Sequence, residues 1–303
     1  IDSHSQRVFE AGAKALMPQV SYTHLDGTSA EARAEALSGA DIFTFPIDNI
    51  QETFGLAPIE AMAAGLPVVV SDWDGMKDTV SADAGIRVTT RSVPGPHRRK
   101  ESFGYHVEGL NYAQYGNNTS ALTEIDLGEL TRAFVTLARD PDKRRAMGEA
   151  GRKRAQRLYD WAAIIPQYQD FWGELSAIRR AAVGRKVVIG ARLNPVAPPP
   201  MELFKSYPSQ PFAPGIGRCV ATPATGLPEV EEMFALRRYD KMKQPFERPE
   251  KVASVLGELR AAGSAGADAP DIAEALEMPT MTVERIFAWL LKFGYARFAK
   301  GEP

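Results

Sequence analysis

Over the first part of the chain, segments whose hydrophobic residues recur at helical spacing are followed by segments with the pattern of strands. Apolar residues at positions 8, 9, 13 and 16 recur at helical spacing and predict a helix over residues 3–16. Ile42, Phe43 and Phe45 form an apolar run that ends at Pro46. Residues 68–70 are a β-branched run without alternation, which is typical of a parallel strand covered on both faces. A further strand is expected at residues 20–25. Thr28 and Glu31 are expected to form a capping box that opens a helix to about residue 39. This succession of strands and helices predicts an α/β domain with a parallel sheet.

The segment between the two apolar runs is expected to be a polar loop followed by a short helix. Pro58 stands where a first helical turn tolerates proline, and Gly65 stands where a helix ends. A strand, a loop and a helix N-terminus in this order place free N–H groups and the positive end of the helix dipole beyond the strand. Such a unit is suited to holding a phosphate.

Two glutamates flank this predicted helix start, Glu52 in the loop and Glu60 in the helix. Gly55 between them allows the backbone to approach a ligand closely. A carboxylate accepts hydrogen bonds from sugar or ribose hydroxyls, and backbone N–H groups suit a diphosphate. Glutamates in a first helical turn are also common for their effect on the helix dipole alone. The flanking residues include Gly-Leu-Pro-Val-Val, which leads from the helix into the next strand. With them in place, a ligand-binding role for the two glutamates is favoured.

The run Glu-Thr-Phe-Gly-Leu-Ala-Pro-Ile-Glu at residues 52–60, followed by Ala-Met-Ala-Ala-Gly-Leu-Pro-Val-Val, resembles the donor-binding signature of retaining GT-B glycosyltransferases. The family is the large nucleotide-sugar-dependent one of the group 1 or family 4 type. The resemblance implies a Rossmann-like sheet, the C-terminal half of a GT-B fold, over residues 1–180. It also implies a catalytic role for Glu52 beside the donor sugar. The residues that it assigns to donor binding are Asp48, Thr53, Phe54, Gly55, Leu56 and Glu60.

The same resemblance implies a first strand and an acceptor-binding N-terminal domain ahead of residue 1. In that family, the preceding stretch also carries an Arg and a Lys for the donor diphosphate. The sequence opens instead on the helix predicted at residues 3–16. We therefore expect a fragment of a longer polypeptide, half of a split enzyme or a degenerate descendant. The expected protein partner is a GT-B N-terminal domain or a partner chain.

The remaining sequence predicts one long loop, three helices and a second domain. Residues 91–124 lack periodicity, and their basic run at 97–100 is interpreted as solvated; contact with phosphates or an acidic membrane surface is the alternative. Capping residues Asp126, Asp140 and Asp160 each open a helix, and the last helix carries an aromatic stripe that would be exposed without a partner. Asp78 is interpreted as structural.

Residues 181–225 form a proline-rich connector, and residues 226–303 are expected to be a small, mainly helical, winged-helix-like domain. A helix that reads DNA should present several basic or amide side chains. The last long helix offers mainly Arg285 and Lys292, so nucleic-acid binding is not expected.

Composition narrows the classes of function. The chain has 303 residues, 44% hydrophobic and 24% charged, with a net charge of −2, which does not favour general nucleic-acid binding. One cysteine excludes an internal disulfide framework and a multi-cysteine metal site. No apolar run reaches the roughly 20 residues of a membrane span and no signal peptide is visible, so a cytoplasmic location is expected, with peripheral membrane contact left open. Asp72 and Asp74 are interpreted as part of a turn, so no metal and no cofactor are expected.

The sequence therefore supports two main hypotheses. The first is the donor-binding part of a retaining glycosyltransferase that uses a nucleotide diphosphate sugar. The alternative is a non-catalytic nucleotide-sugar-binding or assembly module whose helical C-terminal domain binds a partner. A nucleotide-sugar epimerase of similar fold is a third and weaker hypothesis, because the catalytic acids and histidines expected of such an enzyme cannot be located in this sequence. The base, the sugar, the acceptor and the oligomeric state stay open.

Overall fold

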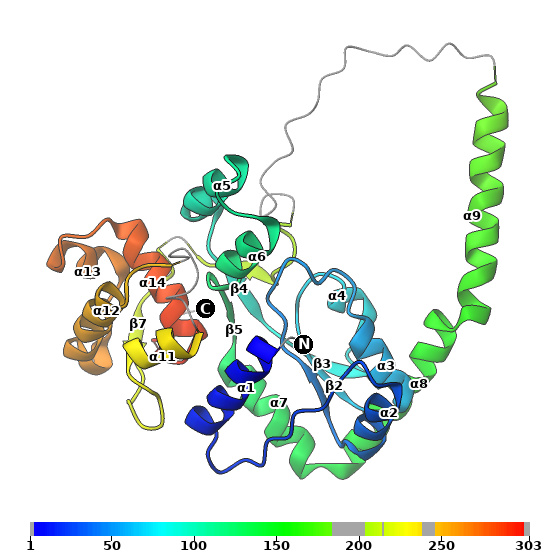
Figure 1. The fold of residues 1–303 in the computed structure, drawn as a ribbon, viewed down its shortest axis with the longest axis horizontal. Coiled ribbons are helices and arrows are strands. Elements are labelled where there is room, and N and C mark those ends of the chain that lie inside the picture. The colour runs from blue at the N-terminus through cyan, green and yellow to red at the C-terminus, as the bar shows by residue number, and fades with distance from the viewer. Residues whose placement is uncertain (1–2, 184–203, 214, 238–245, 300–303) are drawn as a thin grey trace.

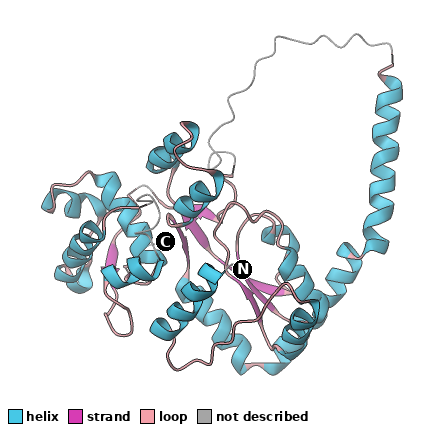
Figure 2. Ribbon diagram, in the orientation of Figure 1, coloured by secondary structure: helices cyan, strands magenta, loops and turns pink. Residues whose placement is uncertain are grey.

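The computed structural model describes residues 3–183, 204–213, 215–237 and 246–299. Its first part is built on a three-stranded parallel sheet in the order β1 (Phe43–Phe45), β2 (Val68–Ser71), β3 (Gly85–Val88) (Figures 1 and 2). All four residues of the central strand β2 are buried, as its unbroken β-branched run predicts. The fold is therefore α/β with a parallel sheet, and this prediction is confirmed.

Helices pack around this sheet. They are α2 (Ala30–Gly39), α3 (Leu56–Ala64), α4 (Met76–Thr79), α7 (Leu127–Arg139) and α8 (Pro141–Tyr159). The side chains of Asp126 and Asp140 cap the starts of α7 and α8, as predicted. For α2, the cap is Ser29 rather than the predicted Thr28, whose hydroxyl instead donates to Asp26.

Close contact between α3 and α8 depends on glycines. Gly65 ends α3 with a φ of 88°, a conformation that favours glycine. Gly148 of α8 faces it, and a Cβ at residue 148 would overlap the carbonyl oxygen of Gly65. These two glycines therefore allow α8 to lie directly on the end of α3.

Replacing Gly148 with alanine should destabilise the protein by about 3 kcal/mol, because the added methyl group meets backbone rather than a movable side chain. Thermal or urea unfolding measures this change in the free energy of unfolding. Gly173→Ala is the matched control, because a Cβ at that helical position meets nothing within 4 Å. Equal stability of the two variants would contradict the proposed packing.

A second sheet follows the first, in the order β5 (Thr123–Ile125), β4 (Thr90–Ser92), β6 (Gln210–Pro211). The segment between β4 and β5 contains η1 (Gly95–Arg98), α5 (Arg99–His106) and α6 (Tyr112–Ser120). The long loop predicted for residues 91–124 is therefore wrong. These helices are short, and α6 begins with a capping box of Asn111 and Gln114 that was not predicted.

The basic run at residues 97–100 also differs from its prediction as a solvated loop. Arg98 is 6% exposed, and the ring of His97 contacts Glu284 of the C-terminal part. Two of the four residues in this run, His97 and Arg98, are therefore largely removed from solvent.

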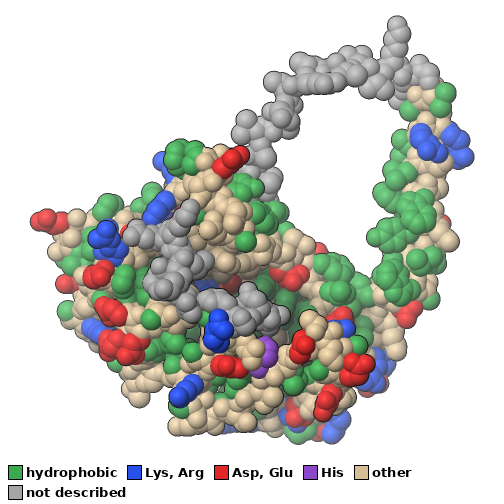
Figure 3. Space-filling view, viewed as in Figure 1, with side chains coloured by type: hydrophobic (Ala, Val, Ile, Leu, Met, Phe, Trp, Pro, Cys, Tyr) green, Lys and Arg blue, Asp and Glu red, His purple; other side chains and the backbone are tan. Residues whose placement is uncertain are grey.

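Helix α9 (Trp161–Ala181) extends away from the rest of the described chain (Figure 1). Asp160 caps its start, as predicted. Hydrophobic side chains gather along α9 in the space-filling view (Figure 3). The large ones that are exposed are Trp161, Ile165, Tyr168, Phe171, Trp172, Leu175 and Ile178. The aromatic stripe is thus exposed in this chain.

The C-terminal part consists of α11 (Val230–Arg237), α12 (Pro249–Ala261), η2 (Gly263–Ala265), α13 (Ala269–Ala275) and α14 (Thr280–Lys292), with β7 (Cys219–Ala221) paired antiparallel to β8 (Ala296–Phe298). The winged-helix interpretation and the domain limits at 180 and 225 stay predictions. Residues 184–203 of the expected connector lie outside the described residues.

Helix α14, the predicted candidate for nucleic-acid contact, is an interior helix. Every residue from position 283 to 291 is buried, including Glu284 and Arg285. Its apolar cluster continues into the first part of the chain through Val93, Ala121 and Leu122. The side chains of residues 283–291 are therefore part of a core, and the absence of nucleic-acid binding stays a prediction.

The N-terminal helix α1 (Ser3–Leu16) has the predicted limits. Together with α11 it lines a hollow of about 520 Å³. The strand predicted at residues 20–25 is wrong, since this segment forms no strand and leaves Val20, Tyr22 and Leu25 exposed. A segment with a strand-like sequence becomes a strand only where a neighbouring strand pairs with its backbone N–H and C=O groups.

Among the described helices, none is both long enough and apolar enough to cross a bilayer.

Candidate active site

The candidate site lies on the donor loop, which we define as residues 46–55 between β1 and α3. The loop begins at the carboxyl end of β1, an edge where parallel sheets commonly bind ligands. Ser71, the last residue of β2, donates a hydrogen bond from its hydroxyl to the carbonyl oxygen of Ile47 at 2.5 Å. The loop is therefore anchored to the central strand close to its own start.

Glu52 lies at the N-terminus of α3. One carboxylate oxygen accepts hydrogen bonds from the backbone N–H of Gly55 at 2.9 Å and of Phe54 at 3.3 Å. These N–H groups precede the helix, where no carbonyl of the helix can accept from them. The same amides were predicted to bind a diphosphate. In this structure, they hold the negative charge of Glu52.

Two glycines make this arrangement possible. Gly55 is the N-cap residue of α3 and has a φ of 80°, in the left-handed region. Gly75, in the turn after β2, packs against the donor loop so closely that a Cβ there would lie 2.6 Å from the Cα of Phe54. The loop and the turn are therefore in direct backbone contact.

The other predicted donor residues are mostly accessible. Thr53, Phe54, Leu56 and Glu60 are exposed, and Gly55 is buried. Phe54 packs edge-on against Tyr159 at the end of α8, with ring centroids 6.1 Å apart. Glu60 lies in the second turn of the same helix whose N-terminus holds Glu52. One helix thus carries or contacts both glutamates.

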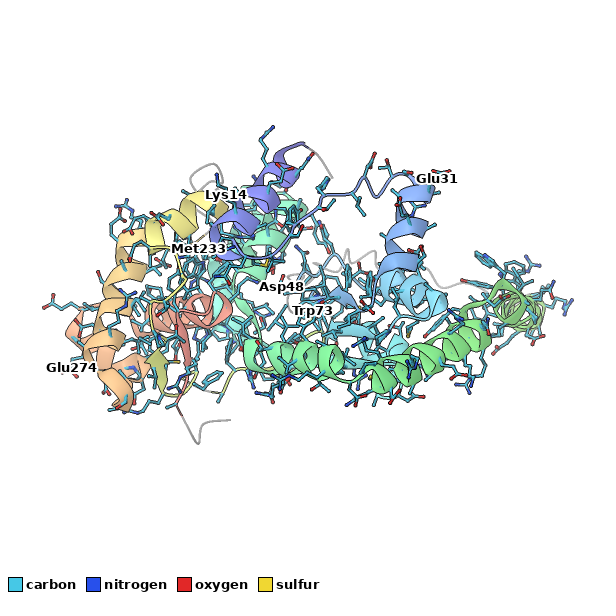
Figure 4. The ribbon with its side chains drawn as sticks, turned by 90° about the horizontal axis from the view of Figure 1, so that it is seen from below. Lys14, Glu31, Asp48, Trp73, Met233 and Glu274 are labelled. Atoms are coloured by element: carbon cyan, nitrogen blue, oxygen red, sulfur yellow. The ribbon has the colours of Figure 1, made fainter. Side chains whose placement is uncertain are left out.

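Asp48 differs from the other predicted donor residues because both of its carboxylate oxygens have protein partners. One accepts from the hydroxyl of Ser120 at 2.6 Å, and the other contacts the ammonium of Lys292. Figure 4 shows Asp48 near Trp73 in the middle of the molecule. Neither Ser120 nor Lys292 was predicted to be a neighbour of the loop. They are 72 and 244 residues from Asp48 along the chain, and no local pattern connects them.

The turn after β2 supplies charged groups beside the donor loop. Burial raises the pKa of Asp74 above its usual value, and burial lowers the pKa of Lys77. The ammonium of Lys77 donates to the carbonyl oxygens of Ser206 at 2.7 Å and Pro208 at 2.8 Å. This lysine is therefore engaged by the segment that precedes β6.

Asp78 lies in the first turn of α4, next to this turn. Its carbonyl oxygen accepts a hydrogen bond from Arg154 of α8 at 2.6 Å.

No group of three or more His, Cys, Asp or Glu side chains within the described residues is arranged to hold a metal ion. Independence from metals stays a prediction.

Comparison with known proteins shows which proteins the chain is similar to. The family model described as "Glycosyl transferases group 1" matches residues 5–95. An alpha-maltose-1-phosphate synthase of Mycolicibacterium smegmatis is 30% identical over 143 residues, which cover 47% of this chain and 30% of that protein. An MMP alpha-(1->4)-mannosyltransferase of Mycolicibacterium hassiacum is 26% identical over 141 residues, covering 46% of this chain and 26% of that protein.

A sulfoquinovosyl transferase of Arabidopsis thaliana is 26% identical over 154 residues, covering 51% of this chain and 23% of that protein. Among solved structures, a sucrose-phosphate synthase from Thermosynechococcus elongatus aligns with a TM-score of 0.40 and 26% identity, over 58% of this chain and 35% of that one. The matched regions thus span less than a third of the length of each curated relative.

These matches show that the chain is similar to group 1 glycosyltransferases. The family model locates this similarity at residues 5–95. The resemblance inferred from residues 52–69 is therefore confirmed at the level of the family.

Proposed function

We propose that this chain supplies the donor-binding part of a retaining glycosyltransferase that takes its sugar from a nucleotide diphosphate sugar. One observation carries the proposal: the N-terminus of α3 already binds an anion, the carboxylate of Glu52, through two backbone N–H groups. A diphosphate carries the same kind of charge, and helix N-termini bind phosphates by the same groups.

In the proposed reaction, the donor diphosphate takes the N–H groups of Phe54 and Gly55, and Glu52 moves to the sugar. The helix N-terminus then stabilises the negative charge that collects on the departing diphosphate. The carboxylate of Glu52 positions the sugar and stabilises positive charge at its anomeric carbon. Glu60, exposed on α3, binds the ribose hydroxyls of the nucleotide. Thr53 and Leu56 line the path between them.

The acceptor side of the reaction is assigned to a GT-B N-terminal domain. Support comes from α9, whose large apolar side chains are exposed, with Trp161 at 73% and Trp172 at 59%. Exposed apolar surfaces of this extent usually mark interaction sites. We therefore propose that the N-terminal domain or a partner chain covers this face.

The chain should bind one class of nucleoside diphosphate and transfer little or no sugar by itself. Titration with the diphosphates of uridine, guanosine, adenosine, cytidine and thymidine, followed by calorimetry and thermal unfolding, identifies the base. At a ligand concentration 100 times the Kd, the bound nucleotide stabilises the fold by about 2.7 kcal/mol. Transfer is expected only when the N-terminal domain is supplied. Failure of every diphosphate to bind, with or without that domain, would overturn the proposed function.

A further inference from the structure

The C-terminal helix α14 is fixed to the α/β part of the chain at two places. At its middle, Arg285 forms a two-pronged ion pair with Glu101 of α5, at 2.8 and 3.1 Å, and both side chains are nearly fully buried. The same guanidinium donates to the carbonyl oxygen of His97 at 2.6 Å. Paired guanidinium–carboxylate contacts of this kind define geometry as well as energy. These contacts therefore fix the orientation of α14 relative to the α/β part.

At its end, α14 reaches the donor loop. The ammonium of Lys292 contacts one carboxylate oxygen of Asp48 and lies 3.3 Å from the carbonyl oxygen of Thr123. The two charged side chains are only 13% and 17% exposed. Because both are largely removed from water, removing one would leave the other as a buried charge without an opposite charge beside it. The pair is thus a strong restraint on Asp48.

The residues directly after Asp48 form hydrogen bonds within the loop and with α6. The next residue, Asn49, accepts a hydrogen bond from the backbone N–H of Glu52 through its carbonyl oxygen at 3.1 Å. Its side-chain oxygen accepts from the N–H of Gln51 at 3.0 Å, and its amide nitrogen contacts Asn117 at 3.4 Å. A compact turn therefore runs directly from Asp48 to the catalytic candidate.

We propose that Lys292 is a positioning residue of the donor site: through Asp48, it holds the donor loop in the arrangement that presents Glu52. The C-terminal helical part is then a component of the donor site rather than a separate module. Asp48 is likewise a positioning residue, because it affects Glu52 only through the donor loop. This inference rests on the proposed function, because it concerns the same site.

The test uses the complete transferring protein and a double-mutant cycle of Lys292→Met and Asp48→Asn. Each single variant should lower kcat by roughly tenfold to a hundredfold, since small displacements of catalytic groups have effects of this size. The Kd for the nucleoside diphosphate should stay within about twofold, because the α3 amides and Glu60 are unchanged. The double variant should be no slower than the slower single variant, and Lys292→Arg should recover part of the lost kcat.

Hydrogen exchange gives a readout that does not depend on activity. Backbone amides of residues 49–55 should exchange about tenfold faster in both single variants and equally fast in the double variant, while exchange in α9 is unchanged. Lys153→Met is the matched control. It removes a lysine–carboxylate pair with Glu149 on the exposed face of α8, far from the loop in the sequence, and should change neither readout.

Different failures have different meanings. If the wild-type protein binds no nucleotide and transfers no sugar, the proposed function is wrong, and the exchange data still test whether Lys292 restrains the loop. If exchange in the loop is unchanged, or kcat is unchanged, or the two substitutions act additively, Lys292 has no positioning role. A large loss of nucleoside diphosphate affinity in Lys292→Met, absent from Asp48→Asn, would mean that Lys292 binds the diphosphate itself, and would also overturn the inference.

Discussion

Glu52→Gln is expected to abolish sugar transfer while nucleoside diphosphate binding is retained or becomes tighter. The glutamine keeps the shape of the side chain, and its amide oxygen can still accept from Gly55, so the loop should stay folded. It removes the negative charge that the proposed reaction needs at the anomeric carbon. Loss of one well-aimed stabilising group costs about 3 kcal/mol, or roughly a hundredfold in kcat.

The effect on binding has the opposite sign for a physical reason. In this structure, the carboxylate of Glu52 occupies the N–H groups of Phe54 and Gly55, so it competes with a diphosphate for the same site. A neutral amide competes less. Steady-state transfer assays and calorimetry with the nucleoside diphosphate separate the two effects. Glu149→Gln, at an exposed site on α8, is the control for loss of one surface charge.

Two results would refute the role of Glu52. One is a kcat within twofold of the wild type. The other is a loss of nucleoside diphosphate affinity as large as the loss of kcat, which would show that the substitution damages the whole site.

Glu60→Ala is expected to weaken nucleotide affinity by roughly tenfold to a hundredfold, because hydrogen bonds to a charged group contribute about 1.5–3 kcal/mol. Glu60 is exposed on α3, and alanine is the best helix former, so the fold should be unaffected. Calorimetric titration of the nucleoside diphosphate measures the change in Kd.

The deoxyribose form of the same nucleotide provides the control for this second prediction. If Glu60 binds the ribose hydroxyls, its removal should matter much less for a nucleotide that lacks one of them. An equal loss of affinity for both nucleotides would show that Glu60 acts elsewhere, and an unchanged Kd for both would remove it from the site.

The sequence predicted the centre of the α/β part well because its signals are local. Pro58 and Gly65 mark the first turn and the end of α3, and the unbroken valine run of β2 indicates burial on both faces. Asp126 and Asp140 cap the helices that they were expected to open. Each of these features depends on residues within a few positions of one another, which is the range over which sequence patterns carry structure.

The errors arise where distant residues decide the structure. The segment 20–25 has the composition of a strand but no strand beside it. His97 was predicted to be solvated, but in the structure its ring contacts Glu284, which lies 187 residues later in the chain. The contacts of Asp48 with Ser120 and Lys292 were not predicted either, while its assignment to donor binding stays a prediction. Such pairings depend on tertiary packing, which a single sequence does not display.

The shared core of α14 has a consequence for recombining this protein with others. Val93, Ala121 and Leu122 of the first part are covered by the same apolar cluster that contains Phe287 and Trp289. A polypeptide cut before β7 would expose these three side chains to water and release the donor loop from Lys292. The two parts therefore cannot be exchanged as independent building blocks: a chimera that keeps the α/β part must also keep its own C-terminal helices.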